Sequence, residues 1–411
     1  MKRSAAHRTI AAGTVVGLSV TLATTLTAPA VAAAASAPTV TETSLTGKRP
    51  VDQPLQDLLD TMVAGQGVGA VGAVQRGQAT WSSAAGVRRA GTTQAARAGD
   101  AFRVGSITKT MVATVAMQLV DERRWTLQTR VDEVLPGLLP GHGDVTLEQL
   151  LSHRSGLPEF LLGVAEEQQA AGLSVDEAYA QSYTDQHLVR LALAQKWGAK
   201  PGTAFSYSNT NYVVVGLMIE KITGAPMKKV LRQRVFNKAH MPHSTFAVDA
   251  RTPRRMLGEH WVDKTVHPFV QDASVFSSAG AVISTTADLN AFTGALFTGR
   301  LTSKGSLNQM KTARSQTPLR YGLGLYSMPD PCAPKGSKRM VYGHNGATFG
   351  TLASVVSTPD GRTRAAAGVT GRIFPPGDVT KQPYGEDFTL PALKLMCRQT
   401  SPPAAPLSAG R

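Results

Sequence analysis

The first clearly patterned part of the chain is a helix followed by two short strands. In VDQPLQDLLDTMVA (51–64), apolar residues recur every three or four positions, so they fall on one face of a helix. VGAVGAV (68–74) and TWSSAAGV (80–87) have the length and composition of strands, and QRGQ between them has the composition of a turn. The pattern therefore predicts a helix and a β-hairpin at the start of the folded chain.

A strongly apolar helix is predicted next, and it begins within FRVGSITKTM (102–111). Apolar residues occur around the whole helix as far as Val120, which is typical of a buried helix. Gly105 permits a tight turn from strand to helix. Ser106 and Lys109 then lie one helical turn apart on the same face, at the helix start.

Residues 122–270 have mainly helical patterns and loops, and strand patterns return in the last third of the chain. RMVYGHNG (339–346) leads into TLASVVSTPDG (351–361), whose Pro-Asp-Gly is a turn signal, and RTRAAAGVTG (362–371) follows. TLPALKLMC (389–397) is predicted to be a closing helix.

Strand patterns near both ends favour one α/β domain formed by residues 51–121 and 271–400 together. The mostly helical residues 122–270 would then be an inserted domain between its halves. Residues 37–50 have the polar, aperiodic composition of a linker, and residues 401–411 are a polar tail.

The N-terminus has the composition of a secretory signal peptide. Basic MKRSAAHR is followed by apolar IAAGTVVGLSVTLATTL and by the small residues of APAVAAAASA. We assign residues 1–36 to the signal peptide and cleavage region, with cleavage between Ala30 and Ala37, and expect a secreted protein. An uncleaved N-terminal anchor is the alternative. No other segment approaches the roughly 20 apolar residues of a membrane span, so no stable span is expected after cleavage.

Cys332 and Cys397 are the two cysteines of the chain. In an oxidising exterior, two cysteines near the end of an exported chain are expected to form one disulfide. Two separate thiols are the alternative.

The chain is basic, but its charge does not point to one partner. The formal net charge of +15 falls to about +12 when Lys2, Arg3 and Arg8 leave with the signal peptide. Contact with anionic cell-wall polymers is compatible with this charge. Because Lys and Arg are dispersed and no nucleic-acid motif is present, we expect no nucleic-acid partner. The sequence also has no metal-binding motif and no phosphate loop, so no metal and no cofactor are expected.

Ser106 and Lys109 form an S-x-x-K pair that can act as an activated nucleophile. At a helix start, unpaired N–H groups and the helix dipole favour negative charge on the serine. A buried lysine there loses its proton more easily or stabilises the alkoxide. The spacing is also compatible with a helix-capping serine and a lysine that reaches solvent.

A second motif, YSNTN, places Tyr207 and Asn209 just before an apolar helix. A tyrosine near a lysine can act as a general base, and an asparagine amide can orient a substrate amide. Ser208 or Asn209 as a helix N-cap is the alternative.

A third motif, GHNGATFG, places His344 at the end of a strand, among glycines that let another backbone approach closely. A surface hairpin with a partly exposed histidine is the alternative.

The order S-x-x-K, Y-x-N and H-x-G resembles the serine penicillin-recognising enzymes, in particular the branch of class C β-lactamases and DD-peptidases. The segments FRVGSITKTMVATVAMQLVDE, LLSHRSGLPEF, YSNTNYVVVGLMIEKITG and YGLGL are similar to those of secreted actinomycete D-alanyl-D-alanine carboxypeptidases. The likeness extends from about residue 55 to Cys397. It implies an α/β fold with an antiparallel sheet flanked by helices and an inserted, mostly helical domain. We expect a monomer.

The resemblance implies a covalent mechanism. Ser106 would attack the carbonyl of a D-Ala-D-Ala bond or a β-lactam and form an acyl-enzyme. Lys109 and Tyr207 would share the proton transfers, and Asn209 would hold the substrate amide. His344 would relay a proton to Tyr207 or lie near the substrate carboxylate.

The resemblance also implies an oxyanion hole made by the backbone N–H groups of Ser106 and Ala347. Three positions depart from the carboxypeptidases: Asn345 and Ala347 replace threonines, and Tyr326 replaces an arginine. In the family these groups help to bind the terminal carboxylate, and each hydrogen bond to a charged group contributes ~1.5–3 kcal/mol. Asn345, Tyr326 and Arg339 are the candidates for substitute contacts.

The sequence therefore predicts an exported serine-type D-alanyl-D-alanine carboxypeptidase that is acylated by β-lactams. Its partners would be a D-Ala-D-Ala peptide or related acyl substrate, and β-lactams. The three departures leave open an esterase, a D-aminopeptidase or a weak β-lactamase of the same family. A non-catalytic wall-binding or β-lactam-sensing module is the alternative from another class of protein.

Overall fold

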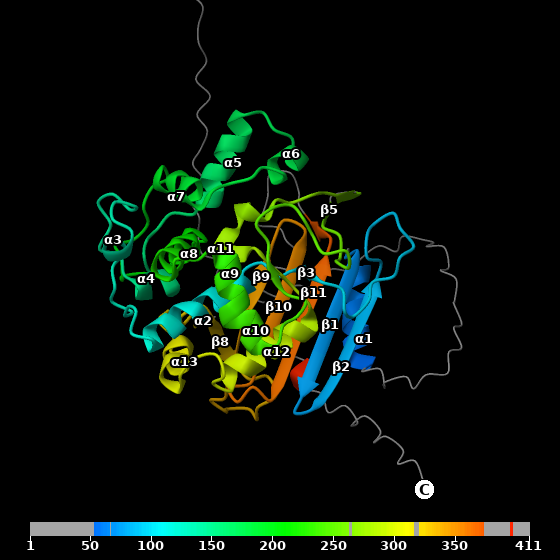
Figure 1. Ribbon diagram of the computed structural model, residues 1–411. Helices are drawn as coiled ribbons and strands as arrows, with labels where there is room; N and C mark the ends of the chain where they lie inside the picture. The colour runs from blue at the N-terminus through cyan, green and yellow to red at the C-terminus, as the bar shows by residue number, and fades with distance from the viewer. Residues whose placement is uncertain (1–52, 66, 263–264, 316–319, 374–394, 398–411) are drawn as a thin grey trace, which may run out of the picture. The chain divides into compact units, whose positions relative to one another are not determined.

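The computed structural model describes residues 53–65, 67–262, 265–315, 320–373 and 395–397 (Figure 1). The predicted signal peptide, linker and polar tail lie outside these residues, so all three stay predictions.

The described residues contain the following helices: α1 (Gln53–Ala64), α2 (Ile107–Asp121), α3 (Val131–Val134), α4 (Leu147–Leu151), α5 (Phe160–Ala170), α6 (Val175–Tyr179), α7 (Asp185–Leu193), α8 (Thr210–Thr223), α9 (Met227–Leu231), α10 (Asn237–Ala239), α11 (Ser277–Gly280), α12 (Thr286–Phe297) and α13 (Lys304–Lys311). A π-helical turn, η1 (Arg232–Phe236), joins α9 to α10, and a 3-10 turn, η2 (Ala273–Val275), precedes α11.

The same residues contain the following strands: β1 (Gly69–Arg76), β2 (Ala79–Gly86), β3 (Phe102–Arg103), β4 (Thr245–Phe246), β5 (His260–Val262), β6 (Val266–Pro268), β7 (Val282–Ser284), β8 (Tyr326–Pro329), β9 (Met340–Ala347), β10 (Thr351–Ser357), β11 (Thr363–Thr370) and β12 (Arg372–Ile373).

The largest sheet in the described part of the chain has six antiparallel strands in the order β2-β1-β11-β10-β9-β8. β1 pairs with β11 along its whole length, from Gly69 opposite Thr370 to Arg76 opposite Thr363. The N-terminal hairpin and the C-terminal strands therefore belong to one sheet (Figure 1). This arrangement confirms the predicted α/β fold, an antiparallel sheet flanked by helices.

The sheet is covered on both faces, because its central strand is apolar on both sides. Val71 and Val74 lie an odd number of positions apart on β1, so their side chains point to opposite faces. Val74 joins the core under α1, and Val71 joins the larger core. In that larger core α12 packs on β1, β10 and β11, and α2 contacts β9 and β10. Helix α2 is thereby buried next to the end of β9.

The predicted helices over 51–64 and after Gly105 correspond to α1 and α2, and the predicted hairpin corresponds to β1 and β2. Residues 122–270 also contain β4, β5 and β6, which the helical pattern did not predict. These strands have only two or three residues, too few to show an alternating pattern. Of the predicted closing helix over 389–397, residues 395–397 are described, and they are helical.

The division of the chain into an α/β domain and an inserted helical domain stays a prediction. Among the described helices, none has the length and apolar character needed to cross a membrane.

A disulfide joins Cys332, in the loop after β8, to Cys397. Leu395 and Met396, just before Cys397, are buried in the core under α1. Arg76 donates a hydrogen bond to the backbone carbonyl of Leu395. The C-terminal segment is therefore held by a covalent bond and by packing.

We predict that the double variant Cys332→Ser with Cys397→Ser folds with a lower free energy of unfolding. The bridge closes a loop with a sequence separation of 65, and a loop of that length restricts the unfolded chain by about 4 kcal/mol in the chain-entropy model. Urea unfolding of the oxidised protein and of the variant, with circular dichroism as the signal, measures the difference. Equal free energies of unfolding would contradict the stabilising role.

Candidate active site

The turn before α2 brings Ser106 against the end of β9. Gly105 has a φ of +52°, in the left-handed region that glycine adopts without strain. A Cβ at Gly105 would lie 2.6 Å from the backbone nitrogen of Ala347, so the two backbones are in contact. The side chain of Ser106 makes no capping hydrogen bond. The helix-capping alternative for Ser106 is therefore wrong, and its hydroxyl is left for other partners.

Lys109 is completely buried beside Ser106. Its Nζ donates to Ser106 Oγ at 2.9 Å, to Asn209 Oδ1 at 2.7 Å and to the Ala279 carbonyl oxygen at 2.9 Å. Burial lowers the pKa of Lys109 to about 7, although the nearby Glu159 carboxylate acts in the opposite direction. Near neutral pH the amine is therefore present in its neutral form, which can accept the proton of Ser106. The alternative of a lysine that reaches solvent is wrong.

Asn209 connects Lys109 to the carboxylate of Glu159. Both the backbone nitrogen and Nδ2 of Asn209 donate to Glu159 Oε2, at 2.8 and 2.9 Å. Glu159 also caps α5, since its Oε1 accepts from the backbone nitrogen of Leu161 at 3.1 Å. Burial raises the pKa of Glu159, while these N–H groups and Lys109 oppose the rise. Asn209 thus orients Lys109 with one end of its amide and Glu159 with the other. Its side chain makes no capping bond to α8.

Tyr207 lies over the lysine amine. Lys109 Nζ is 5.0 Å from the centroid of the Tyr207 ring, and His153 stacks on that ring at 4.1 Å. Although the residue is 40% exposed, desolvation raises the pKa of Tyr207, and the nearby Ser106 side chain opposes the rise. The tyrosine hydroxyl therefore stays protonated at neutral pH, and Lys109 is the better candidate for the base.

His344 lies in the site's wall but is bonded to a different tyrosine. Its Nε2 is 3.0 Å from the hydroxyl of Tyr321, and its ring centroid is 6.5 Å from that of Tyr207. Burial lowers the pKa of His344 to about 3, against the effect of its hydrogen bond with the Asn345 carbonyl. The ring is therefore neutral at pH 7 and supplies no positive charge to a substrate carboxylate. A proton relay from His344 to Tyr207 has no direct hydrogen bond to use.

Gly346 lets β9 lie against the turn that carries the serine. A Cβ at Gly346 would lie 1.9 Å from the Val104 carbonyl oxygen and 3.0 Å from the Ser106 nitrogen. The backbone N–H groups of Ser106 and Ala347 are therefore close together. Two N–H groups in that arrangement can stabilise the oxyanion of an acyl-transfer reaction.

The structure does not bring all the predicted carboxylate-binding residues to this site. Tyr326 is only 1% exposed, and its ring centroid lies 5.4 Å from that of His344, so it belongs to the wall of the site. Its predicted contact with the substrate stays a prediction. Arg339 pairs with Asp330 and is not free for a substrate. Asn345 is partly exposed on β9, so it stays a candidate.

Three residues of the site were not singled out by the sequence analysis: Glu159, His153 and Tyr321. His153 is buried with a φ of +55°, a strained conformation for a residue other than glycine. Its Nδ1 accepts from the backbone nitrogen of Ser208 at 3.2 Å, which positions the ring beneath Tyr207. Glu159 and His153 both occur in LLSHRSGLPEF, and Tyr321 in YGLGL. The signal available in the sequence was that these titratable residues lie in segments that resemble the family.

The described residues contain no candidate site for a metal ion. No three His, Cys, Asp or Glu side chains there are grouped so that they could hold an ion.

Comparison with known proteins agrees with this arrangement. The sequence model of the beta-lactamase family matches residues 55–374. Over 220 residues, the chain is 32% identical to penicillin-binding protein 4 of Amycolatopsis lactamdurans, covering 51% of this chain and 54% of that protein. Over 278 residues, it is 27% identical to a D-aminopeptidase of Cereibacter sphaeroides, covering 66% of this chain and 51% of that protein. The chain thus spans about half the length of these curated relatives.

Among solved structures, a D-stereospecific amidohydrolase from Streptomyces sp. superposes with a TM-score of 0.71 at 31% identity. The superposition covers 78% of this chain and 95% of that chain. The fold and the match over most of the sequence define a protein of the penicillin-binding and β-lactamase type. The chain belongs to the beta-lactamase family.

We predict that kcat/KM for an uncharged ester substrate falls about tenfold per pH unit below about pH 7. Protonation of Lys109, whose pKa is lowered to about 7, removes the base in the free enzyme. Glu159 raises the pKa of Lys109, so Glu159→Gln should move this acidic limb to lower pH. Glu166→Gln, an exposed residue of α5, is the matched control and should leave the limb in place. A limb that moves to higher pH in Glu159→Gln would contradict the assignment.

We also predict that Gly346→Ala lowers kcat by about a hundredfold or more. The new methyl group would collide with the Val104 carbonyl and move the Ala347 N–H from the serine, and loss of one oxyanion donor costs 10²–10³ in kcat. Steady-state kinetics on an ester measures the loss. Gly99→Ala, where a Cβ meets no atom within 4 Å and φ is not positive, is the control for a general glycine effect. Unchanged kcat in Gly346→Ala would be incompatible with an oxyanion role for this strand.

Proposed function

We propose that the protein is an exported serine amidohydrolase that hydrolyses amides and peptides of D-amino acids carrying a free amine. The observation that carries this proposal is the carboxylate of Glu159, which is linked to the nucleophile through Asn209 and Lys109. A carboxylate at that position attracts a substrate ammonium group and repels a substrate carboxylate. The D-stereospecific amidohydrolase and D-aminopeptidase relatives also support this substrate class.

The proposed reaction begins with neutral Lys109. Its Nζ takes the proton of Ser106 while Oγ forms a bond with the amide carbonyl carbon, and the N–H groups of Ser106 and Ala347 stabilise the oxyanion. The proton then passes through the hydroxyl of Tyr207 to the leaving nitrogen, and the C–N bond breaks. Water then attacks the acyl carbon and gives one proton to neutral Lys109. When the bond between Ser106 Oγ and the acyl carbon breaks, Lys109 returns this proton to Oγ, and the acid is released.

Glu159 would hold the α-ammonium group of the substrate. Its Oε1 accepts one backbone hydrogen bond, from Leu161, so it has capacity for another donor. Its negative charge acts on both Lys109 and Tyr207, which places it within electrostatic range of the reacting groups. A hydrogen bond to a charged partner contributes ~1.5–3 kcal/mol, or about ten- to a hundredfold in affinity.

D-alanyl-D-alanine carboxypeptidase activity, with acylation by β-lactams, is the second candidate. The motif order and the penicillin-binding relative favour it. It requires a group that binds a terminal carboxylate, and Arg339 pairs with Asp330 while Tyr326 is buried beside His344. Asn345 is then the remaining candidate for that contact among the three predicted substitutes. For this reason we place this activity second.

Export rests on the composition of residues 1–36, and the disulfide between Cys332 and Cys397 is compatible with an oxidising exterior. Contact with anionic wall polymers stays part of this proposal because of the basic composition.

The test compares three substrates of the purified protein: D-alaninamide, N-acetyl-D-alaninamide and a diacylated Lys-D-Ala-D-Ala peptide. We expect D-alaninamide to be hydrolysed at least about tenfold more efficiently than its N-acetyl form, because acetylation removes the ammonium group. At a pH above the acidic limb, where Lys109 is neutral in both proteins, Glu159→Gln should raise KM for D-alaninamide about tenfold and leave KM for the N-acetyl form unchanged. Ser106→Ala should reduce every activity at least about a thousandfold.

Ammonia release measures the two amides, and D-alanine release measures the peptide. Glu166→Gln serves as the matched charge control. Ser106-dependent release of D-alanine without hydrolysis of D-alaninamide would overturn the proposal in favour of the carboxypeptidase.

A further inference from the structure

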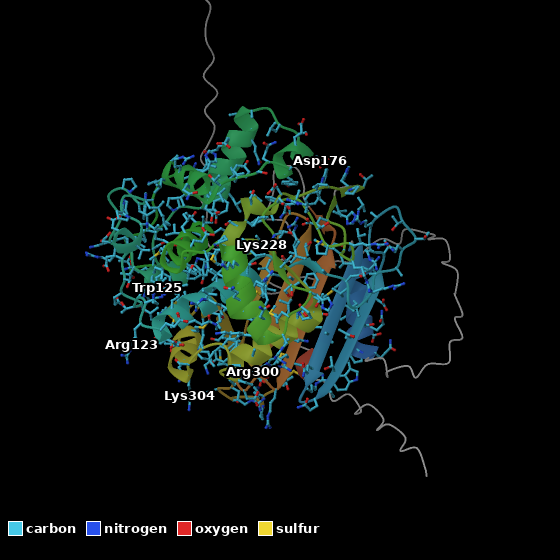
Figure 2. The ribbon with its side chains drawn as sticks, viewed as in Figure 1. Arg123, Trp125, Asp176, Lys228, Arg300 and Lys304 are labelled. Carbon is cyan, nitrogen blue, oxygen red and sulfur yellow. A yellow bond between two sulfur atoms is a disulfide. The ribbon has the colours of Figure 1, made fainter. Side chains whose placement is uncertain are left out.

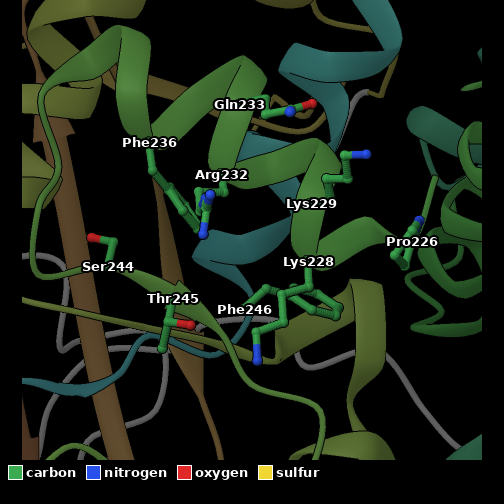
Figure 3. Close-up of a pocket in the computed structure, with 9 residues that line it drawn as sticks. All are labelled: Pro226, Lys228, Lys229, Arg232, Gln233, Phe236, Ser244, Thr245 and Phe246. Atoms are coloured by element: carbon green, nitrogen blue, oxygen red, sulfur yellow. The ribbon is translucent and has the colours of Figure 1, made fainter.

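A cavity of about 410 Å³ lies beside the helix formed by α9 and η1 and is closed on its other side by β4 (Figure 3). Its volume is within the range of small-molecule sites. Three cationic side chains line it: Lys228, Lys229 and Arg232. In Figure 2, Lys228 is labelled apart from Arg123 and Lys304, which belong to other segments of the chain.

The three cations of this cavity have no anionic partner in the described part of the chain. No carboxylate lies within ion-pair distance of Lys228, Lys229 or Arg232 there, and none of the three donates a side-chain hydrogen bond. Asp249 feels the charge of Lys228, but its own ion pair is with Arg251. The cavity therefore has an excess of positive charge.

The floor of the cavity is apolar. Phe236 and Phe246 line it, and each is at most 5% exposed. In Figure 3, Arg232 and Lys228 point into the same hollow as Phe246 and Thr245, whereas Gln233 points away from it. The three cations belong to exposed residues, so they border the opening of the cavity, and the two buried aromatic rings form its floor.

The helix that forms the wall is irregular at the same place. Residues Arg232–Phe236 form the π turn η1, in which the backbone nitrogen of Asn237 donates to the Arg232 carbonyl. π turns are rare and occur frequently at functional sites. Both ends of this turn, Arg232 and Phe236, line the cavity.

The cavity is separate from the Ser106 site. Helix α8 starts next to Asn209 and has 14 residues, a rise of about 21 Å, and the cavity begins at Pro226, after its last turn. On α2, Gln118 donates to the Arg234 carbonyl at 3.1 Å, nine positions or about 13 Å beyond Lys109. The cavity thus lies toward the opposite ends of the two helices that carry the candidate active site.

We propose that this cavity binds a small organic phosphate, an aryl or alkyl phosphomonoester. A phosphomonoester carries a charge of about −1.5 to −2 at pH 7, more than the single negative charge of a carboxylate. It therefore matches a cluster of three positive side chains better than a carboxylate does. Arg232 provides the planar guanidinium that binds two phosphate oxygens, and Lys228 acts as a second positive charge. Phe236 and Phe246 contact the apolar part of the ligand.

Isothermal titration of the full-length protein with phenyl phosphate at low ionic strength tests the proposal. We expect saturable one-to-one binding, at least tenfold tighter than binding of inorganic phosphate or benzoate. The double variant Lys228→Gln with Arg232→Gln should bind phenyl phosphate at least tenfold more weakly. The control, Lys200→Gln with Lys335→Gln, removes the same charge from exposed positions and should bind within twofold of the parent protein.

Both double variants should retain the parent protein's rate of ester hydrolysis, because neither changes the Ser106 site. A retained rate also shows that the variants are folded. Equal binding by the two double variants would overturn the proposal, as the affinity would then follow net charge alone. Equal affinity for phenyl phosphate and inorganic phosphate would also overturn it, because the aromatic floor would then make no contribution.

Discussion

The burial of one amine is the constraint on which the candidate site depends. An ammonium group without solvent requires acceptors, and Lys109 finds them on three separate segments: the Ser106 turn, the start of α8 at Asn209, and α11 at Ala279. The same burial lowers the pKa of Lys109 to about 7. The contacts that fix α2, α8 and α11 relative to one another therefore also hold a base beside a serine. A change in the packing of these helices would therefore also change the position and the pKa of the base.

Two further features act on that base and its serine. The carboxylate of Glu159, through Asn209, keeps the lysine pKa from falling further and adds negative charge to the site. The close approach of Gly105 to Ala347 brings two backbone N–H groups together where negative charge would develop. A buried amine, a carboxylate and two convergent backbone N–H groups thus surround the serine. This order of charges agrees better with a substrate that brings an ammonium group than with one that brings a carboxylate.

The sequence predicts helices and strands whose apolar residues recur at regular spacing. It does not predict contacts between side chains that only the folded chain brings together. Helix α2 and the first hairpin were predictable because their apolar spacing extends over eight residues or more. The S-x-x-K spacing predicted that Lys109 lies next to Ser106, but only the structure excludes a lysine in solvent. Glu159 could not be assigned because its partner Asn209 is 50 positions away. Tyr326 was expected to contact the substrate, and the structure places its buried ring beside that of His344, a position that the sequence pattern alone could not give.

The most direct measurement is the mass of the protein quenched during reaction with a slowly released acyl donor, such as a β-lactam. Digestion with trypsin would release residues 104–109, which contain Ser106 and end at Lys109. The adduct should be found on this peptide, and the variant Lys109→Met, which keeps the volume but loses the amine, should acylate at least about a thousandfold more slowly. Acylation of Lys109→Met at the rate of the parent protein, or an adduct outside residues 104–109, would show that the buried amine does not activate the serine.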